Sequence, residues 1–412
     1  MVINEIGYRE PTPIQRQAIP IGMQNRDIIG VAETGSGNTC AFLVPMLAFS
    51  MELPRLNEFT ASDGPYALIL APTRELAQQI ERESLRFARP LGFHCVSLVG
   101  GHSIEEQSLQ LRNGAEIIIA TPGRLRDCLQ RSVIVLNQCT YVVMDEADRM
   151  VDMGFEDDVN FILDALPVGS TKPDSEEAEQ ANRMVVNGMP TYRQTTMFSA
   201  TMPPAVESIA RKFMRRPAVV TIGMAGQIVD TIEQRVEMLN EERKRQRLAQ
   251  ILEQDFAPPI IVFVNQKKNA DVLARYVDKL GYRSVVLHGG KTQDAREVAL
   301  KQLKSGSHDV LVATDVAARG IDIANVSLVI NYDMAKSIED YTHRIGRTGR
   351  AGKSGVAITF LTPQDSHVFY DLKQALMRSS VSTCPPELAN HEDAQIKPMK
   401  VVQVAASGPS DD

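Results

Sequence analysis

Short apolar segments alternate with longer stretches of helical periodicity along most of the chain. Val, Ile and Leu fill these segments, and strands that are buried on both faces of a parallel sheet have this composition. The intervening stretches are long enough to cross over a sheet as helices, so we predict an α/β fold with doubly wound parallel sheets. The segments are ALILAP (67–72), EIIIATP (116–122), YVVMDEAD (141–148), IIVFVN (260–265), SVVLHGG (284–290), DVLVATD (309–315) and SLVINYD (327–333).

The alternation occurs twice along the 412 residues, which indicates two domains. A single hydrophobic core stops growing near roughly 250–300 residues, so the length agrees with this division. A segment at about 168–193 has no clear period and contains KPDSEEAEQ, which is typical of a surface insertion. We expect a first domain at 1–221, a short glycine-containing hinge at 222–231, a second domain at 232–379 and an extended tail at 380–412.

Composition narrows the class of protein. The hydrophobic content of 43% supports packed cores, and no apolar run approaches the ~18 residues of a membrane span. Five cysteines occur without a CxxC pair, which favours a reducing compartment and buried thiols. The net charge of −7 argues against a diffuse nucleic-acid coat but allows a focused basic groove.

The stretch AETGSGNT (32–39) resembles a phosphate-binding loop, G-x-x-x-x-G-K-[ST]. Gly35 and Gly37 allow backbone N–H groups to turn toward phosphate at the start of a helix, and Thr39 can ligate Mg²⁺. Asn38 occupies the lysine position and cannot place a positive charge on the β- and γ-phosphates. The loop therefore predicts nucleotide binding with impaired turnover.

A proline-led segment, GYREPTPIQ, precedes this loop and ends at Gln15. A side-chain amide can pair with both N6 and N7 of adenine, so Gln15 is a candidate base reader. Taken alone, Gln15 is better explained as an exposed glutamine at the start of a helix after a proline turn.

Carboxylates and hydroxyls follow two further predicted strands. Asp145, at a strand end, is placed as the usual magnesium partner of a phosphate loop, and Glu146 can orient and deprotonate a water molecule. A solvated acidic turn is the alternative, which the upstream phosphate loop disfavours. Ser199 and Thr201, after QTTMF, can bridge the acidic motif to the rest of the site.

The stretch HRIGRTGRAG (343–352) places Arg344, Arg347 and Arg350 three residues apart. On one helical face such arginines would suit insertion into a phosphate site as arginine fingers. A solvated basic face is the alternative, but the two intervening glycines are poor residues for such a helix.

Other segments after the predicted strands mix small residues, hydroxyls and arginine. They lie at the sheet edge where α/β proteins bind ligands, and their donors suit a sugar-phosphate backbone rather than base edges. Each one alone can also be an ordinary strand-to-helix turn. The segments are PTREL (72–76), Gly100–Gly101, TPGR (121–124), HGG (288–290) with Gln293 and Arg296, and TDVAARGID (314–322).

In this order and spacing, over about residues 5–362, the motifs resemble the DEAD-box family of ATP-dependent RNA helicases. Within that family the chain is similar to the spliceosomal helicases of the tri-snRNP that act at the 5′ splice site. The segments that carry this narrower similarity are KPDSEEAEQ (172–180), NYDMAKSIEDY (331–341) and CPPELANHEDAQ (384–395).

The resemblance implies two RecA-like domains, ATP and Mg²⁺ as cofactors, and single-stranded RNA bound across both domains. It also implies a nuclear location, spliceosomal proteins, pre-mRNA and small nuclear RNA as partners, no membrane, and a monomeric core. Catalytic roles are implied for Glu146, Asp145, Arg347, Arg350, Ser199, Thr201 and His343. Nucleotide contacts are implied for Gln15, Thr34, Gly35, Ser36, Gly37, Asn38, Thr39, Gly320 and Asp322, with Thr39 and Asp145 on the metal. RNA contacts are implied for Pro72, Thr73, Arg74, Gly101, Thr121, Arg124, Gln293, Arg296 and Thr314.

The chain departs from the family pattern in two places. Asn38 replaces the family's lysine, and the chain begins too close to Gln15 to include the aromatic residue that stacks on adenine in relatives. We therefore expect a longer natural protein with an N-terminal extension. Three functions follow as hypotheses: an RNA-dependent ATPase that separates short duplexes, a catalytically impaired RNA clamp, and a DNA-translocating helicase, which the PTPIQ motif disfavours.

Overall fold

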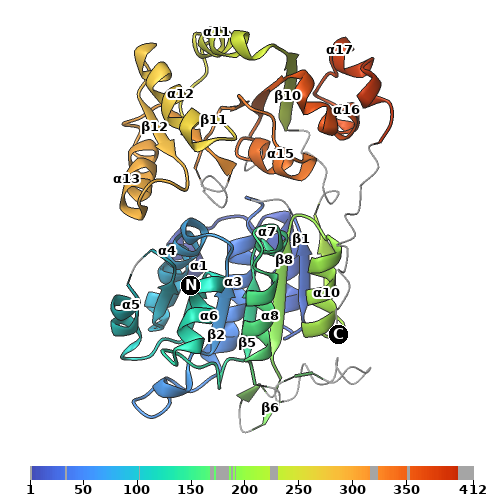
Figure 1. The fold of residues 1–412 in the computed structure, drawn as a ribbon. Helices are drawn as coiled ribbons and strands as arrows, with labels where there is room; N and C mark the ends of the chain where they lie inside the picture. The colour runs from blue at the N-terminus through green and yellow to red at the C-terminus, as the bar shows by residue number, and fades with distance from the viewer. Residues whose placement is uncertain are drawn as a thin grey trace, which may run out of the picture. The chain divides into compact units, whose positions relative to one another are not determined.

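A computed structural model describes residues 2–32, 35–101, 103–167, 171–172, 185–186, 189–190, 192–222, 231–315, 323–349 and 353–397. The chain divides into two compact units, whose long segments meet between residues 227 and 228. In Figure 1 the first unit runs mainly from blue to green and the second from yellow to red. Residues 223–230 lie outside the described part of the chain, so the hinge at 222–231 stays a prediction.

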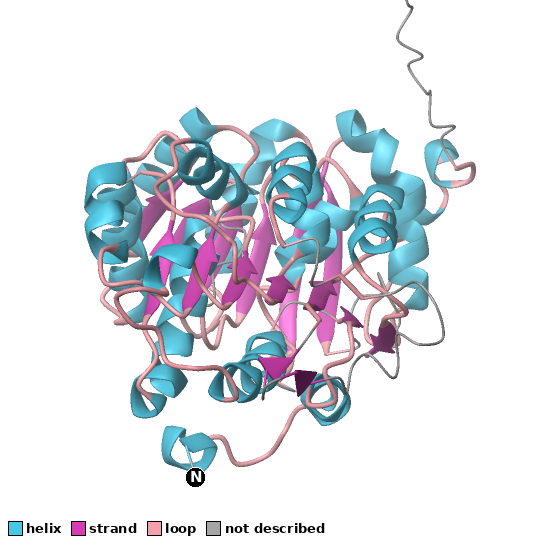
Figure 2. Ribbon diagram, turned by 90° about the horizontal axis from the view of Figure 1, so that it is seen from below, coloured by secondary structure: helices cyan, strands magenta, loops and turns pink. Residues whose placement is uncertain are grey.

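The first unit contains a seven-stranded sheet whose neighbouring strands all pair in parallel. Figure 2 shows strands in a row with helices on both sides. The strands, in spatial order, are β3 (Cys95–Leu98), β4 (Ile117–Ala120), β2 (Ala67–Leu70), β5 (Tyr141–Met144), β8 (Gln194–Ser199), β1 (Ile28–Val31) and β9 (Ala218–Thr221). The helices are α1 (Val2–Ile6), α2 (Pro13–Gly22), α3 (Asn38–Met51), α4 (Arg74–Leu91), α5 (Ile104–Leu111), α6 (Pro122–Gln130), α7 (Ala147–Asp152), α8 (Glu156–Asp164) and α10 (Pro204–Phe213).

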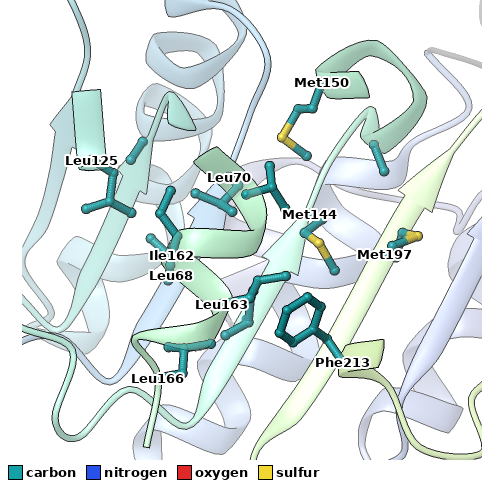
Figure 3. Close-up of a cluster of buried hydrophobic side chains, with 14 of the residues drawn as sticks. Leu68, Leu70, Leu125, Met144, Met150, Ile162, Leu163, Leu166, Met197 and Phe213 are labelled. Carbon is teal, nitrogen blue, oxygen red and sulfur yellow. The ribbon is translucent and has the colours of Figure 1, made fainter. Parts of the chain in front are cut away.

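Two hydrophobic cores cover the two faces of this sheet. Leu68 and Leu70 of β2 face one core, and Ile69 between them faces the other. Figure 3 shows the first core, where Ile162 and Leu163 of α8 pack on the strands. Because both faces are covered, every strand position favours an apolar residue, which explains the uninterrupted apolar runs in the sequence.

Helix starts follow local chemistry in the first unit. The Thr73 hydroxyl accepts a hydrogen bond from the Leu76 N–H at 3.3 Å, and Ser103 does the same for Glu106 at 3.1 Å. Pro122 occupies the first turn of α6, where its missing N–H has no helical partner to lose. These caps begin helices directly after strands, so the polar residues of each motif stay at the carboxyl edge of the sheet.

The second unit contains a six-stranded sheet, also parallel throughout. None of the described helices in either unit is long and apolar enough to cross a membrane. The strands, in spatial order, are β10 (Ile232–Met238), β15 (Gly355–Leu361), β14 (Leu328–Asn331), β11 (Ile260–Phe263), β13 (Val310–Ala313) and β12 (Ser284–Leu287). The helices are α11 (Glu241–Leu252), α12 (Lys267–Lys279), α13 (Gln293–Lys304), α15 (Ile338–Ile345) and α16 (Phe369–Arg378).

The C-terminal segment corrects one prediction. We expected an extended tail at 380–412, but residues 386–394 form α17 (Pro386–Ala389) and a 3₁₀ turn, η5 (Glu392–Ala394). Leu388 is fully buried, and Lys373 Nζ donates a hydrogen bond to the Ala389 carbonyl at 2.9 Å. A helical turn brings Leu388 onto α16 while satisfying its own backbone, which an extended path would leave unpaired. Residues 398–412 lie outside the described chain.

The predicted insertion at about 168–193 is anchored at Lys172, and most of its other residues lie outside the described chain, so the surface insertion stays a prediction. Lys172 is buried, and its Nζ lies 2.6 Å from Asp27 Oδ1, directly before β1. The same carboxylate accepts hydrogen bonds from the N–H groups of Thr195 and Arg215. Burial lowers the pKa of Lys172, while the Asp27 charge opposes that shift. Farther along this segment, β6 (Val185–Val186) pairs antiparallel with β7 (Met189–Pro190).

Candidate functional site

The three strands that carry the predicted nucleotide motifs are neighbours in the first sheet. The order β5–β8–β1 places the acidic motif, the SAT motif and the phosphate loop side by side at the carboxyl edge. Val31 pairs in register with Ser199, and the Ala32 N–H donates to the Ser199 carbonyl at 3.1 Å. The sheet therefore brings together residues that lie more than a hundred positions apart in the sequence.

The phosphate loop adopts a backbone that requires glycine. Gly35 and Gly37 have φ angles of 88° and 100°, in the left-handed region. A Cβ on Gly37 would lie 2.6 Å from Gln15 Nε2 and 2.7 Å from Thr12 Oγ1. Gly37 also caps the N-terminus of α3, where N–H groups can bind an anion. Thr34 lies outside the described residues.

Asn38 is held within this loop by its neighbour. The Ser36 hydroxyl donates a hydrogen bond to Asn38 Oδ1 at 2.9 Å. The asparagine side chain is thus engaged through its oxygen, and it brings no positive charge to the loop. Thr39 follows in the first turn of α3, and its contact with a metal stays a prediction.

Gln15 is not an exposed glutamine, so that alternative is excluded. Only 4% of the residue is exposed, and its Nε2 donates to the Gly37 carbonyl at 3.0 Å. Its Oε1 accepts from the Thr12 N–H at 3.0 Å, which closes the start of α2. Gln15 therefore ties the PTPIQ segment to the phosphate loop, while its contact with adenine stays a prediction.

A closed set of hydrogen bonds joins the acidic motif to the SAT motif. Asp148 Oδ2 accepts from both the N–H and the hydroxyl of Thr201, at 2.9 and 2.8 Å. The Ser199 hydroxyl accepts from the Asp148 N–H at 3.1 Å and donates to the Thr201 carbonyl at 2.7 Å. The expected bridge between the two motifs is present. The sequence had given no role to Asp148, whose burial at 2% exposure is the signal that only the structure supplies.

Asp145 and Glu146 occupy an unusual electrostatic position. Burial, with the nearby Glu146 charge as a smaller cause, raises the pKa of Asp145 to about 8. Glu146 has a φ of 52°, in the left-handed region, and its N–H donates to Asp145 Oδ1 at 3.1 Å. No cluster of three or more His, Cys, Asp or Glu side chains suited to a metal occurs among the described residues. A metal here would therefore need ligands from phosphate or water in addition to protein.

The predicted RNA motifs lie on the other half of the same edge, after β3, β4 and β2. A Cβ on Gly101 would lie 2.3 Å from Arg74 Nη1, and one on Gly100 would lie 2.9 Å from Arg74 Nη2. The glycine pair thus makes room for the guanidinium, and burial lowers the pKa of Arg74. Pro72 and Thr73 are buried beside it.

The TPGR motif begins α6 after β4. The Thr121 N–H donates to the Leu98 carbonyl of the neighbouring strand at 3.1 Å, which fixes the start of the motif. Arg124 Nη1 donates to Gln107 Oε1 of α5 at 3.1 Å. Gln107 is a residue that the sequence motifs did not single out.

The second unit corrects the grouping of Arg344 with Arg347 and Arg350 on one helical face. Helix α15 ends at Ile345, where Gly346 interrupts it, so Arg347 lies outside the helix that contains Arg344. Arg344 is 2% exposed, and its Nη2 donates to Asp315 Oδ2 and to Asn265 Oδ1, both at 2.7 Å. Arg344 therefore anchors the strand ends of this sheet and is not available as a finger.

From Gln293 onward, the predicted site residues other than Arg344 stay predictions. Arg347 is 5% exposed and its Nε donates to the His343 carbonyl at 3.2 Å, just past the end of α15. The Thr314 N–H donates to the Leu287 carbonyl at 3.1 Å, directly after β13. Gln293 and Arg296 lie one turn apart in α13. Arg350, Gly320 and Asp322 lie outside the described residues.

Comparison with known proteins places the chain in a family. Residues 12–209 match the DEAD/DEAH box helicase family, and residues 243–352 match the helicase conserved C-terminal domain. The pre-mRNA-splicing ATP-dependent RNA helicase PRP28 of Coccidioides immitis is 64% identical over 405 residues, which are 97% of this chain and 49% of that protein. The chain thus spans about half the length of the curated relatives it matches.

Two solved structures extend the comparison. The RNA helicase Prp28 from Chaetomium thermophilum, bound to ADP, is 53% identical, covering 95% of this chain and 88% of that one, with a TM-score of 0.46. Dbp5 of S. cerevisiae, bound to RNA and ADP BeF3, is 29% identical, covering 93% and 91%, with a TM-score of 0.76. The predicted fold class, two RecA-like parallel-sheet domains, is confirmed.

Proposed function

Because the chain belongs to the DEAD-box family of ATP-dependent RNA helicases, we propose that it is the core of an RNA-dependent ATPase that remodels short RNA duplexes in pre-mRNA splicing. The observation that carries the proposal is the strand order of the first sheet. Three adjacent strands, β5–β8–β1, present the nucleotide motifs, and three others, β3–β4–β2, present backbone-gripping motifs at the same edge.

The nucleotide half has the donors that ATP requires. Backbone N–H groups of the phosphate loop from Gly35 to Gly37 and the start of α3 bind phosphate oxygens. Thr39 and Asp145 would hold Mg²⁺, which supplies positive charge to the phosphates. The raised pKa of Asp145 fits this role, since a buried carboxyl without a cation favours its proton. Glu146 would take a proton from the attacking water.

The RNA half has cations and hydroxyls at one edge. Arg74 and Arg124 would bind phosphate oxygens, with backbone contacts from Gly101 and Thr121. Such contacts carry no base code, so the binding is expected to tolerate sequence and to weaken with salt. The two halves touch at one place, since β2 and β5 are adjacent and the Asp145 N–H donates to the Leu70 carbonyl at 2.9 Å. We propose that ligand binding to one half of the edge affects ligand binding to the other half through this border.

We propose that the substrates are pre-mRNA and small nuclear RNA at the 5′ splice site, in the nucleus and with spliceosomal proteins as partners. The support is a 64% identical relative that is named as a pre-mRNA-splicing ATP-dependent RNA helicase. Single-stranded RNA across both domains, the domain limits 1–221 and 232–379, and a monomeric core belong to the same proposal.

A catalytically impaired RNA clamp is a second candidate, and one contact favours it. The bond from the Ser36 hydroxyl to Asn38 Oδ1 closes the loop on a neutral side chain where the family has lysine. Without that cation, charge on the departing γ-phosphoryl group is less stabilised, which can cost orders of magnitude in rate.

One assay separates these candidates. RNA-stimulated ATP hydrolysis and RNA binding are measured for this chain and for Asn38→Lys, with Asn38→Lys/Glu146→Gln as the inactive control. Turnover that appears in Asn38→Lys and is slow in the unchanged chain supports a helicase core with an impaired loop. RNA binding by both with turnover in neither supports the clamp. Failure of both proteins to bind RNA would overturn both candidates.

A further inference from the structure

Gln107 is the one fully buried residue of α5 in the first unit. The helix is short and otherwise exposed or half-buried, and Gln107 is 3% exposed. A surface helix normally turns apolar side chains to the core, because burying an amide costs free energy unless its groups are hydrogen-bonded. The burial of a glutamine here therefore indicates that its hydrogen bonds are the reason for its position.

The amide connects two motifs that belong to different strands. Gln107 Nε2 donates to the Val99 carbonyl at 2.6 Å, directly before Gly100–Gly101. Gln107 Oε1 accepts from Arg124 Nη1 at 3.1 Å, in the TPGR segment. Because β3 and β4 are neighbours, one side chain spans the ends of both.

The amide of Gln107 carries no net charge, and this determines its effect on Arg124. An arginine side chain loses considerable rotamer entropy when it is fixed in one orientation, so an arginine that is oriented in advance binds more tightly. A carboxylate would orient the guanidinium equally well but would cancel much of its charge. The glutamine oxygen orients Arg124 without adding a negative charge beside the guanidinium.

The donor side of the same amide acts on Arg74. By bonding the Val99 carbonyl, Gln107 fixes the chain just before the glycine pair against which the Arg74 guanidinium lies. Movement of this turn by a few tenths of an ångström would displace Arg74, because Gly101 leaves no spare room beside it. The amide thus sets the positions of two cations on adjacent strands.

We propose that Gln107 is a positioning residue for RNA, which holds Arg124 directly and Arg74 through the Val99–Gly101 turn in the geometry that grips two backbone phosphates. This proposal rests on the RNA-binding function proposed above. Gln107 touches no RNA in it and acts only through the two arginines.

The test uses this chain and a single-stranded oligouridylate labelled for fluorescence anisotropy, over a series of salt concentrations. Gln107→Leu removes both hydrogen bonds at similar volume, and about tenfold weaker RNA binding is expected. The salt dependence of the affinity is expected to become shallower, as it does in Arg124→Ala, because a phosphate contact is lost. Affinity for ADP is expected to stay unchanged. Gln110→Leu, the same change at an exposed position of α5, is the matched control.

Two further variants distinguish positioning from simple support of the fold. In the Arg124→Ala background, Gln107→Leu is expected to weaken RNA binding only through its effect on Arg74. The loss of RNA affinity in the double variant is therefore smaller than the sum of the two single losses. Gln107→Glu keeps an acceptor for Arg124 but adds a negative charge, and it is expected to bind RNA more weakly than wild type. If Gln107→Leu does not fold, Gln107→Glu and Gln107→Asn carry the same comparison.

The outcomes separate this proposal from the function on which it rests. If wild type binds RNA and the Gln107 variants bind it with the same affinity, the positioning role alone is overturned. Full additivity between Gln107→Leu and Arg124→Ala overturns it as well. Equal losses of RNA and ADP affinity would also overturn it, since they indicate general disruption. If the wild-type chain does not bind RNA, the proposed function fails and this role fails with it.

Discussion

The carboxyl ends of β5, β8 and β1 collect carboxylates and hydroxyls, whereas those of β3, β4 and β2 collect arginines and glycines. In the first group, Asp148, Ser199 and Thr201 satisfy one another, and Asp145 retains a carboxyl that favours its proton. In the second group, Arg74 lies on the glycine pair and Arg124 rests on a neutral amide. The proposed function assigns a cation to the first half of the edge and a polyanion to the second.

This contrast teaches how one sheet can bind two highly charged ligands. ATP with its metal and RNA with its phosphates would compete for a single basic groove. The carboxylates and the arginines follow different strands, which separates the two kinds of site, while the backbone pairing of the adjacent strands β5 and β2 connects them. A substitution in one half of the edge therefore tests whether ligand binding in the other half depends on it.

The largest effect is expected for Asn38→Lys in the nucleotide half. A lysine at this position gains charge-assisted contacts worth on the order of 1.5–3 kcal/mol, so ATP affinity is expected to rise about ten- to a hundred-fold. ADP should gain less, because the lysine also faces the γ-phosphate. Calorimetry on both proteins measures this, and RNA affinity without nucleotide is expected to stay constant. Equal ATP affinities in the two proteins would contradict the role assigned to this position.

The buried carboxyl of Asp145 predicts a pH effect on stability without metal. Its folded-state pKa is raised to about 8. Its contribution to stability is therefore present below about pH 4 and is lost as the pH rises through the folded-state pKa. Asp145→Asn is expected to become more stable than wild type over that window, by on the order of a few kcal/mol at its upper end.

Denaturant titrations in chelator at several pH values measure this difference, with the exposed Asp157→Asn as control. If the stability difference between wild type and Asp145→Asn does not change with pH, the charge of the Asp145 carboxylate is already compensated in the fold. RNA affinity at pH 7 is expected to be the same in both proteins.

Gly101→Ala tests the RNA half. The new Cβ would lie 2.3 Å from Arg74 Nη1, so the guanidinium must move. RNA affinity is expected to fall about tenfold, the loss of one charge-assisted contact, while ADP affinity stays unchanged. The control is Gly154→Ala, whose glycine also has positive φ but has no heavy atom within 4 Å of the added Cβ. Equal RNA losses in both variants would assign the effect to backbone strain.

The smallest effect concerns the backbone of Glu146. Its φ of 52° is unfavourable for a residue with a Cβ, so Glu146→Gly is expected to be about 1 kcal/mol more stable than Glu146→Ala. Both variants, made in the Asn38→Lys protein, are expected to lose ATP hydrolysis because the carboxylate is gone. Thermal denaturation and an ATPase assay measure the two effects. A glycine variant no more stable than the alanine one would show that the chain relaxes at this position.

The sequence predicts the α/β class well, because strands covered on both faces leave long apolar runs such as 67–72 and 141–144. It also places Asp145 and the phosphate loop at strand ends. It does not predict that β8 lies between β5 and β1, since strand order depends on contacts between segments far apart in the chain. That order is what brings Ser199 and Thr201 to Asp148.

Burial explains most of the remaining differences. Arg344 shares its spacing with Arg347, yet it is an internal anchor because Asp315 and Asn265 close around it. Gln107 and Lys172 read as ordinary polar residues in the sequence and are buried in the fold. The sequence around a polar residue does not show whether a distant segment supplies its hydrogen-bond or ion-pair partner. Only the structure therefore identifies Arg344, Gln107 and Lys172 as buried.

Asp27 has a consequence for the order in which the protein forms during synthesis. The partners of its carboxylate, Lys172, Thr195 and Arg215, lie 145, 168 and 188 residues further along the chain. A ribosome releases the chain from its N-terminus, so β1 is made long before any of them. Burying an unpaired carboxylate is costly, and β1 therefore cannot settle between β8 and β9 until Arg215 has emerged. The phosphate loop is encoded near the start of the chain, but it is among the last parts of the first unit to take its final form.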